Sequence, residues 1–422
     1  MAIDPRATLL PGGRTADPRR FYLGYRALAN FLNAVAASTY GLYVVREAGL
    51  SPLELVLVGT ALELSAFVFE VPTGVIADVY SRRLSVLIGV FVSGVSWMVM
   101  AAVPGFLFVA IGQVILGLGF TFRSGALEAW LADEIGEDRA AATYLRGTQL
   151  SQLGFLLGIP IGVVAATVDL QAPMLVGGAL HLFLALAVAL TMSERGFIPH
   201  ATRGWSAVGT TALAGIRAMG GRPVLIAIVA ITLIGGASGE SLDRFNPLIF
   251  LDEVGLPGGD GANEAIWFGV FTAGGMLGGV ALVELISRFT DTERIRSLVW
   301  ALVALEAVLI VAMLLFGTAQ LFAVALTTYW ITAWVRQAAH PLTLAWLNRG
   351  LDPRSRATVL SLQSQADALG QGAGGPVMGV IATATTVRVA IVAAGLLLLP
   401  ALPIFASQLR RSEDQPTPEA PR

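Results

Sequence analysis

The feature that most constrains this chain is a series of long apolar stretches, each about as long as a lipid bilayer is thick. A membrane-spanning helix needs about 20 mostly apolar residues, and the sequence holds twelve stretches of this kind. Their approximate bounds are 21–45, 53–77, 84–103, 105–131, 143–167, 172–192, 223–251, 264–287, 297–317, 319–347, 357–383 and 387–408. Short connections such as 103–105, with Pro and Gly, separate them. The sequence therefore predicts an all-α membrane protein with twelve transmembrane helices.

The composition excludes several other classes of protein. Only 13% of the 422 residues are charged, against roughly 25% in soluble domains, which argues against a soluble enzyme, a disordered chain or a nucleic-acid-binding protein. All 27 basic residues are Arg, and there is no Lys and no Cys. Because a Walker-type ATP site needs Lys, ATP is not expected to be the direct energy source. With three His, we expect no metal site, no cofactor and no enzymatic activity.

The Arg residues mark one side of the predicted membrane protein. Cytoplasmic loops collect positive charge, and 20 of the 27 Arg lie in the two tails and in alternate loops. The opposite loops hold only Arg46 and Arg388. We therefore expect both termini on the cytoplasmic side of a bacterial cytoplasmic membrane. Arg19 and Arg20 are similar to a twin-arginine export signal, but eleven spans follow the first, which favours a positive-inside anchor.

An internal repeat divides the chain into two halves. At a shift of 216 residues several identical residues coincide: Trp130 with Trp346, Gly154 with Gly370, Gly158 with Gly374, and Pro160 with Pro376. Two consecutive six-helix halves in the same orientation are a known plan of secondary transporters. The predicted organisation is a cytoplasmic tail 1–20, a first half 21–192, a cytoplasmic central loop 193–222, a second half 223–408 and a cytoplasmic tail 409–422. Trp130 and Trp346 lie near helix ends and are expected to anchor at the membrane interface.

A short signature follows the second predicted span. The string GVIADVYSRR occupies residues 74–83 and resembles the loop 2–3 signature of the major facilitator superfamily, which runs Gly, three residues, Asp, two residues, Gly, Arg, and Lys or Arg. Ser81 replaces the second Gly, which predicts a less tight loop. Gly74 is expected to allow close helix packing.

The same resemblance implies a charged latch at the cytoplasmic side. In the superfamily the Asp and Arg of the signature pair with an acid at the end of helix 4, and Asp133 occupies the matching position. The expected latch consists of Gly74, Asp78, Arg82, Arg83 and Asp133, and it would hold the cytoplasmic side shut when the transporter faces outward. The alternative is a positive-inside cluster with a helix-capping acid.

Two Gly-rich stretches carry a further resemblance. GFLLGIPIG at 154–162 and GQGAGGPVMG at 370–379 are similar to the antiporter motif of the superfamily, through Gly154, Gly158, Pro160, Gly162, Gly374 and Pro376. Together with FEVPTGVIADVYSRR at 69–83 and GALEAWLADE at 125–134, they resemble the drug:proton antiporter branch that includes macrolide and tetracycline exporters. Small residues also let membrane helices approach closely, so packing and sealing of the periplasmic side are both compatible with these stretches.

Ionisable residues inside the spans are the candidate functional residues. Each costs about 2.5–3.5 kcal/mol at the bilayer centre, so each calls for a role. The candidates for proton coupling or a substrate cavity are Arg26, Glu63, Glu70, Arg123, Glu128, Glu240, Arg244, Arg336 and Asp367. Glu63 and Asp367 lie deepest and are the first candidates for carrying a proton, with structural hydrogen bonding as the equal alternative. Glu240 and Arg244 have the spacing of an i,i+4 ion pair.

These patterns lead to one functional hypothesis and one alternative. The hypothesis is a proton-driven exporter of a small amphipathic, drug-like compound, cationic compounds included, that works by alternating access. The alternative is a proton-coupled importer of a sugar or organic acid. Seven acids against five Arg inside the spans argue against import of an anion. The expected partners are the small-molecule substrate, protons and the lipid bilayer, with no nucleic acid, and the protein is expected to be a monomer.

Overall fold

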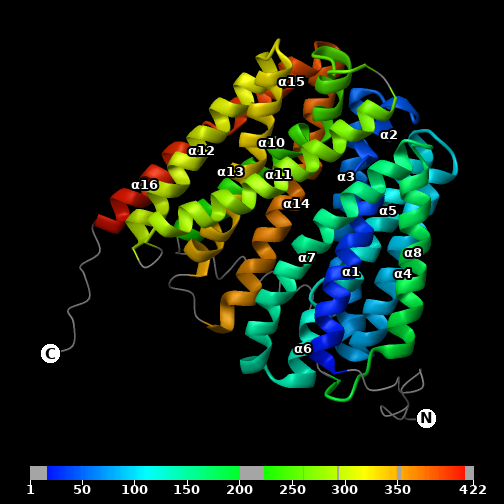
Figure 1. Cartoon of the computed structure of the whole chain (residues 1–422). Coiled ribbons are helices and arrows are strands. Elements are labelled where there is room, and N and C mark those ends of the chain that lie inside the picture. The colour runs from blue at the N-terminus through cyan, green and yellow to red at the C-terminus, as the bar shows by residue number, and fades with distance from the viewer. Residues whose placement is uncertain (1–16, 200–222, 260, 292–293, 349–352, 414–422) are drawn as a thin grey trace. The chain divides into compact units, whose positions relative to one another are not determined.

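The structure is a computed structural model that describes residues 17–199, 223–259, 261–291, 294–348 and 353–413. The predicted N-terminal tail 1–16, most of the central loop and the end of the C-terminal tail lie outside these residues. Within the described ranges the chain is helical and contains no strand (Figure 1). The prediction of an all-α fold is therefore confirmed.

Every predicted span is helical in the structure. In chain order the helices are α1 (Pro18–Ala37), α2 (Tyr40–Arg46), α3 (Pro52–Val79), α4 (Arg82–Ala102), α5 (Phe106–Arg123), α6 (Ala126–Ile135), α7 (Glu137–Ala166), α8 (Ala172–Thr191), α10 (Pro223–Leu248), the π-helix η1 (Ile249–Glu253), α11 (Ala262–Phe289), α12 (Ile295–Thr318), α13 (Phe322–Asn348), α14 (Pro353–Ala384), α15 (Val387–Leu397) and α16 (Ala401–Glu413). Ten spans among the described residues are long and apolar enough to cross a membrane. The more polar α13 and α14 have 27 and 32 residues, which is also long enough to cross.

Four of the predicted spans contain an interruption of the helix that the hydropathy pattern did not indicate. The first span breaks between α1 and α2, the fourth between α5 and α6, the seventh changes to η1, and the last breaks between α15 and α16. In the fourth span Gly125 has φ +70°, a left-handed conformation that favours glycine. The helix therefore stops at Arg123 and restarts at Ala126.

The chain forms two compact units. The first consists of Met1–Ser51, Val58–Thr210 and Gly259–Val270, and the second of Pro52–Leu57, Thr211–Gly258 and Phe271–Arg422. The units follow the two predicted halves except for the short segments 52–57 and 259–270, each of which groups with the opposite half.

Repeated glycines hold one helix pair together in each unit. In the first unit α1 packs along α7, where a Cβ on Gly154 or Gly158 would collide with a backbone oxygen of α1. In the second unit α10 packs along α14, where a Cβ on Gly370 or Gly374 would collide with the backbone of α10. These are the glycines that coincide in the sequence repeat, so the repeat corresponds to the same close helix contact in both units.

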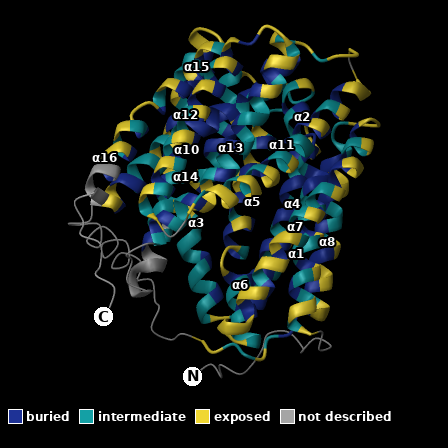
Figure 2. Cartoon of the chain, turned by 60° about the vertical axis from the view of Figure 1, so that its left-hand side comes forward, coloured by how far each residue is buried: buried dark blue, intermediate teal, exposed yellow. Residues whose placement is uncertain are grey.

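Some helices expose a largely apolar face, and α8 is an example. On α8, Val176, Phe183, Leu186 and Leu190 are exposed along one face, while the opposite face, with His181, is buried. Exposed and buried residues alternate around the other helices as well (Figure 2). A face of exposed large apolar residues is suited to lipid rather than water.

Both repeated tryptophans are packed inside their units. Trp130 is 1% exposed, and its indole donates a hydrogen bond of 2.6 Å to Ser193 O. Trp346 is 3% exposed and packs against Phe405 with ring centroids 5.7 Å apart. The expectation of interfacial anchors was therefore wrong, because each indole fills a protein core.

The two Arg residues expected on the side opposite the cytoplasm, Arg46 and Arg388, are each paired with an acid. Arg46, at the end of α2, lies 2.7 Å from Glu264 within the first unit, and Arg388, in α15, lies 2.9 Å from Glu253 within the second. Neither Arg therefore adds net positive charge where it lies.

Candidate functional site

The signature after α3 forms an ion-pair cluster with the end of α6. Arg82 Nε lies 3.1 Å from Asp133 Oδ2, and Arg82 Nη2 lies 3.9 Å from Asp78 Oδ1. The Arg82 side chain is largely buried. The structure thus brings together three of the residues expected to form a latch. Gly74 does not serve close packing, because a Cβ there would meet nothing within 4 Å.

Ser81 has a role that the family glycine could not fill. It is the N-cap of α4, with extended backbone (φ −174°), and its hydroxyl accepts a hydrogen bond of 2.9 Å from Leu84 N. The same hydroxyl donates to Glu194 at 2.6 Å, and Glu194 also accepts from Arg83 N at 3.0 Å. Ser81 and Glu194 therefore satisfy two amide groups of the first turn. No local pattern indicated this role of Glu194, because its partners lie more than 100 positions away.

Residues 193–196, which follow α8, are bound both to α6 and to the start of α4. Their backbone is bound to α6, since Glu134 accepts hydrogen bonds from the amides of Arg195 and Gly196. Glu194 is bound to the start of α4. A Cβ on Gly196 would collide with Asp133 O. The linker segment, residues 193–196, thus ties the start of α4 to the end of α6 beside the Arg82–Asp133 ion pair.

A second polar cluster of the first unit lies inside the fourth span. Glu128 Oε1 is 3.4 Å from Arg26 Nη1 and accepts a 3.5 Å hydrogen bond from the Tyr22 hydroxyl. Tyr144 donates to the backbone oxygen of Glu128 at 2.7 Å. Arg123, at the end of α5, donates from Nε to Gly119 O at 3.3 Å. Arg26, Arg123 and Glu128, separate in the sequence, are therefore gathered around the break between α5 and α6.

Two of the acids of α3, Glu63 and Glu70, are candidates for proton binding, and both are partly buried. The carboxyl group of Glu70 has no hydrogen-bond or ion-pair partner among the described residues, and Thr73 Oγ1 donates to the backbone oxygens of Phe69 and Glu70. Glu63 lies seven positions earlier in the same helix. Both remain candidates for proton binding.

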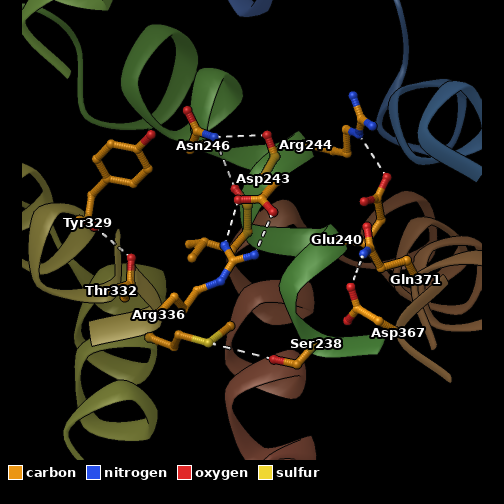
Figure 3. Close-up of polar contacts among 12 residues, drawn as sticks. Ser238, Glu240, Asp243, Arg244, Asn246, Tyr329, Thr332, Arg336, Asp367 and Gln371 are labelled. Carbon is orange, nitrogen blue, oxygen red and sulfur yellow. Dashed lines mark hydrogen bonds and ion pairs between the residues drawn. The ribbon is translucent and has the colours of Figure 1, made fainter. Parts of the chain in front are cut away.

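A third cluster lies in the second unit, where α10, α13 and α14 meet (Figure 3). Arg336 binds Asp243 through two hydrogen bonds, of 2.7 and 2.8 Å. The side chains are 37% and 50% exposed, so this ion pair is only partly covered by the protein. Gly239 and Gly236 of α10 leave room for the cluster, since a Cβ would lie 3.0 Å from Arg336 Nη2 and 2.9 Å from Asp367 Oδ1. Sequence reasoning did not include Asp243 among the site residues.

The backbone of Asp243 is bound by the Asn246 side chain, because Pro247 interrupts the helical hydrogen bonding there. Pro247 has no amide hydrogen, so the backbone oxygen of Asp243 loses its normal helical partner. Asn246 Nδ2 donates to that oxygen at 2.9 Å instead (Figure 3). The helix then continues as η1. The spacing Asp, two residues, Asn, Pro was the available sequence signal for this site.

The other acids of this cluster differ in their partners. Glu240 is 2% exposed and accepts a 2.8 Å hydrogen bond from Arg244 Nε, as its spacing predicted. Asp367 accepts a 2.9 Å hydrogen bond from Gln371 Nε2, a neutral donor (Figure 3). In this cluster Asp243 and Glu240 are thus ion-paired with Arg, whereas Asp367 is bound by an amide.

The remaining antiporter-type residues lie in the helices expected. A Cβ on Gly162 would collide with α1 at Ser38 and Val35. Pro160 and Pro376 lie inside α7 and α14. Among the described residues no group of three His, Asp or Glu is arranged to hold a metal ion.

Paired charges inside long apolar helices, repeated in two units, define the class of multi-pass membrane transporters. The chain matches the family model described as Major Facilitator Superfamily over residues 25–331. It belongs to this family, and it is therefore a membrane transporter of small molecules.

Known proteins of the family resemble this chain along almost its whole length. "Uncharacterized MFS-type transporter YxaM" of Bacillus subtilis (strain 168) is 21% identical over 382 residues, which cover 90% of this chain and 92% of that protein. The crystal structure of a bacterial homologue of the human lysosomal transporter Spinster, inward-facing and unoccupied, has a TM-score of 0.76 at 15% identity and covers 96% of this chain and all of that one. The nucleoside transporter NupG has a TM-score of 0.75 at 13% identity, covering 92% and 99%. At these identities the structures are similar in fold alone.

Proposed function

We propose that this chain is a proton-coupled exporter of small amphipathic compounds, cationic ones included, in the bacterial cytoplasmic membrane, with both termini in the cytoplasm. Membership of the transporter family supplies the general activity. The Gly-rich antiporter-type stretches of α7 and α14 support export by resemblance. The concentration of Arg in the tails and alternate loops supports the orientation.

The observation that carries proton coupling is the environment of Asp367. Its carboxyl group lies within α14 and is bound by Gln371, not by a base. Adding a proton to Asp243 or Glu240 would disrupt an ion pair with Arg336 or Arg244. Adding a proton to Asp367 leaves both pairs in place. Asp367 can therefore gain and lose a proton during the transport cycle without breaking either of these ion pairs.

The cluster of Asp78, Arg82 and Asp133 is proposed as the latch of the cytoplasmic side. Arg82 is largely buried and contacts both acids. Opening this side would separate charges that are shielded from water, so the ion pair would stabilise the closed state. Alternating access then requires that the latch forms and breaks once in each transport cycle.

A drug-susceptibility panel on cells that express the full chain tests the function. Wild-type protein should raise tolerance to some amphipathic compound, and Asp367→Asn, Glu63→Gln and Asp78→Asn should lose this effect at equal membrane abundance. Collapse of the proton gradient should abolish it in the wild type. Arg288→Gln, which removes an exposed Arg288–Glu284 pair, serves as the matched control. Tolerance that persists without a gradient would contradict proton coupling, and raised sensitivity with faster accumulation would indicate import of a nutrient-like compound instead.

A further inference from the structure

The break in the fourth span leaves the start of α6 exposed in the first unit. Ser124 and Gly125 are exposed, and α6 begins at Ala126 without a side-chain cap. The first amides of a helix have no partner within the helix, and with the helix dipole they favour a negative charge. A helix start alone does not define a binding site, so the side chains around it decide the question.

Two guanidinium groups lie next to this break, and only one of them contacts a carboxylate. Arg26 contacts Glu128 through Nη1 alone, at 3.4 Å, and its buried Nε has no hydrogen-bond partner. Arg123 donates from Nε to Gly119 O and forms no ion pair with a described residue. Arg26, Arg123 and Glu128 together therefore carry one net positive charge and several unused donors.

A buried hydroxyl points to the same place. Tyr25 is 6% exposed, and its hydroxyl donates no hydrogen bond to a described residue. The Arg123 guanidinium is within hydrogen-bonding reach of this hydroxyl, and the charges of Glu128 and Arg26 also act on it, so the hydroxyl lies beside Arg123. Buried tyrosine hydroxyls ordinarily find a partner. Tyr25 thus adds a third unused donor beside the two guanidinium groups.

In the polar cluster of the second unit, by contrast, both Arg residues are paired with acids. There Arg244 is paired with Glu240 and Arg336 is bound by Asp243 through two bonds. With Asp367, that cluster has more acids than bases. Among these two clusters, the unused donors therefore lie around the break between α5 and α6.

We propose that Tyr25, Arg26, Arg123 and the start of α6 form a subsite for an anionic group, a carboxylate or similar oxyanion, of an amphipathic substrate. An oxyanion accepts several charge-assisted hydrogen bonds at once, and it would balance the positive charge left by Glu128. This subsite deepens the proposed function, since it assumes that the chain carries an amphipathic compound. It also changes the expected substrate, because a purely cationic compound would be repelled here.

Binding of three matched probes tests the subsite. 2-Naphthoate, 2-naphthalenemethanol and 2-naphthylmethylamine share one ring system and differ in the charge of the head group. The purified full chain is placed in phosphatidylcholine nanodiscs, which contain no anionic lipid, and the dissociation constant of each probe is measured without a proton gradient. The carboxylate should bind most tightly. Arg123→Gln or Arg26→Gln should raise its Kd about tenfold or more, and Tyr25→Phe about threefold.

Matched variants separate a specific loss from misfolding. Binding of the alcohol should be unchanged in all three variants, and Arg123→Lys should restore part of the carboxylate affinity. Arg388→Gln removes an outer-loop guanidinium and should leave carboxylate binding unchanged. Absent carboxylate binding, tighter binding of the amine, or an equal loss in Arg388→Gln would overturn the subsite. The binding measurement needs no proton gradient. If transport proved independent of protons, the proposed coupling would fail, but the measured affinity for the carboxylate probe would still test the subsite.

Discussion

Arg336 binds Asp243 through two hydrogen bonds, whereas Arg26 contacts Glu128 through a single guanidinium nitrogen at 3.4 Å. A bidentate pair between a guanidinium and a carboxylate fixes both the position and the orientation of its partners. The Arg336–Asp243 pair of the second unit is therefore suited to a structural role, because it holds α10 and α13 in a fixed relative position. The looser pair in the first unit retains donors that another molecule can use.

The different partners of Asp367 and Glu240 predict different defects. Asp367→Asn keeps a hydrogen-bonding side chain beside Gln371, so the thermal stability in detergent should stay close to that of the wild type while proton-driven transport is lost. Glu240→Ala removes the buried partner of Arg244 and should lower the free energy of unfolding by about 3 kcal/mol. Thermal unfolding and proton-driven flux in proteoliposomes measure both effects. Equal destabilisation by the two substitutions would contradict this distinction.

The latch predicts a selective loss of transport. Asp133→Asn weakens the partly buried contact with Arg82 and should reduce the transport rate at least about tenfold, because the cytoplasmic side would no longer close. The accessibility of single cysteines introduced at the C-terminal ends of α3 and α6 should increase at the same time. Glu284→Gln, which breaks an exposed pair, should change either quantity little. Unchanged accessibility in Asp133→Asn would refute the latch.

The helix contact through Gly158 predicts a packing defect. A Cβ there would collide with Phe31 O of α1, so Gly158→Ala should push α1 away from α7 and lower the free energy of unfolding by about 1–3 kcal/mol. Gly374→Ala should act in the same way in the second unit. Gly24→Ala is the matched control, because a Cβ at Gly24 meets nothing within 4 Å. A melting temperature of Gly158→Ala at or above that of Gly24→Ala would rule out the close contact.

Ser81 and Glu194 predict a coupled stability effect. Both satisfy amides of the first turn of α4 and bind each other. Ser81→Ala alone should cost about 1 kcal/mol. A double-mutant cycle with Glu194→Ala should give a coupling energy of about 0.5–3 kcal/mol, measured from thermal unfolding of the four proteins. Strict additivity would mean that the linker segment 193–196 does not support the start of α4.

Local patterns along the chain predicted much of this protein. The spans could be read from hydropathy because a bilayer fixes the length of a helix. The Arg82–Asp133 contact followed from a family spacing, and the Glu240–Arg244 pair from helix periodicity. The partner of Arg336 did not follow, because Asp243 lies 93 positions away on another helix.

The errors have a common cause. Trp130 near a helix end was expected at the membrane interface, yet it is buried. The break after Arg123 was missed because a single Gly among apolar residues is also compatible with a continuous membrane helix. The burial of Trp130 and the end of the helix at Arg123 both depend on the residues that pack against these positions.

The sequence by itself determined the all-helical membrane fold, the two repeated halves and the glycines that join one helix pair in each. Hydropathy, helix periodicity and small-residue spacing are local properties, and each is encoded within a few turns of helix. The tertiary structure alone decided which charges meet: Arg336 with Asp243, and Arg26 with Glu128 at the start of α6. The reason is geometric, since the rotation and vertical position of each helix are fixed by its packing against other helices. A shift of one residue turns a side chain about 100° around the helix axis, so only the packed helices determine which side chains share a site.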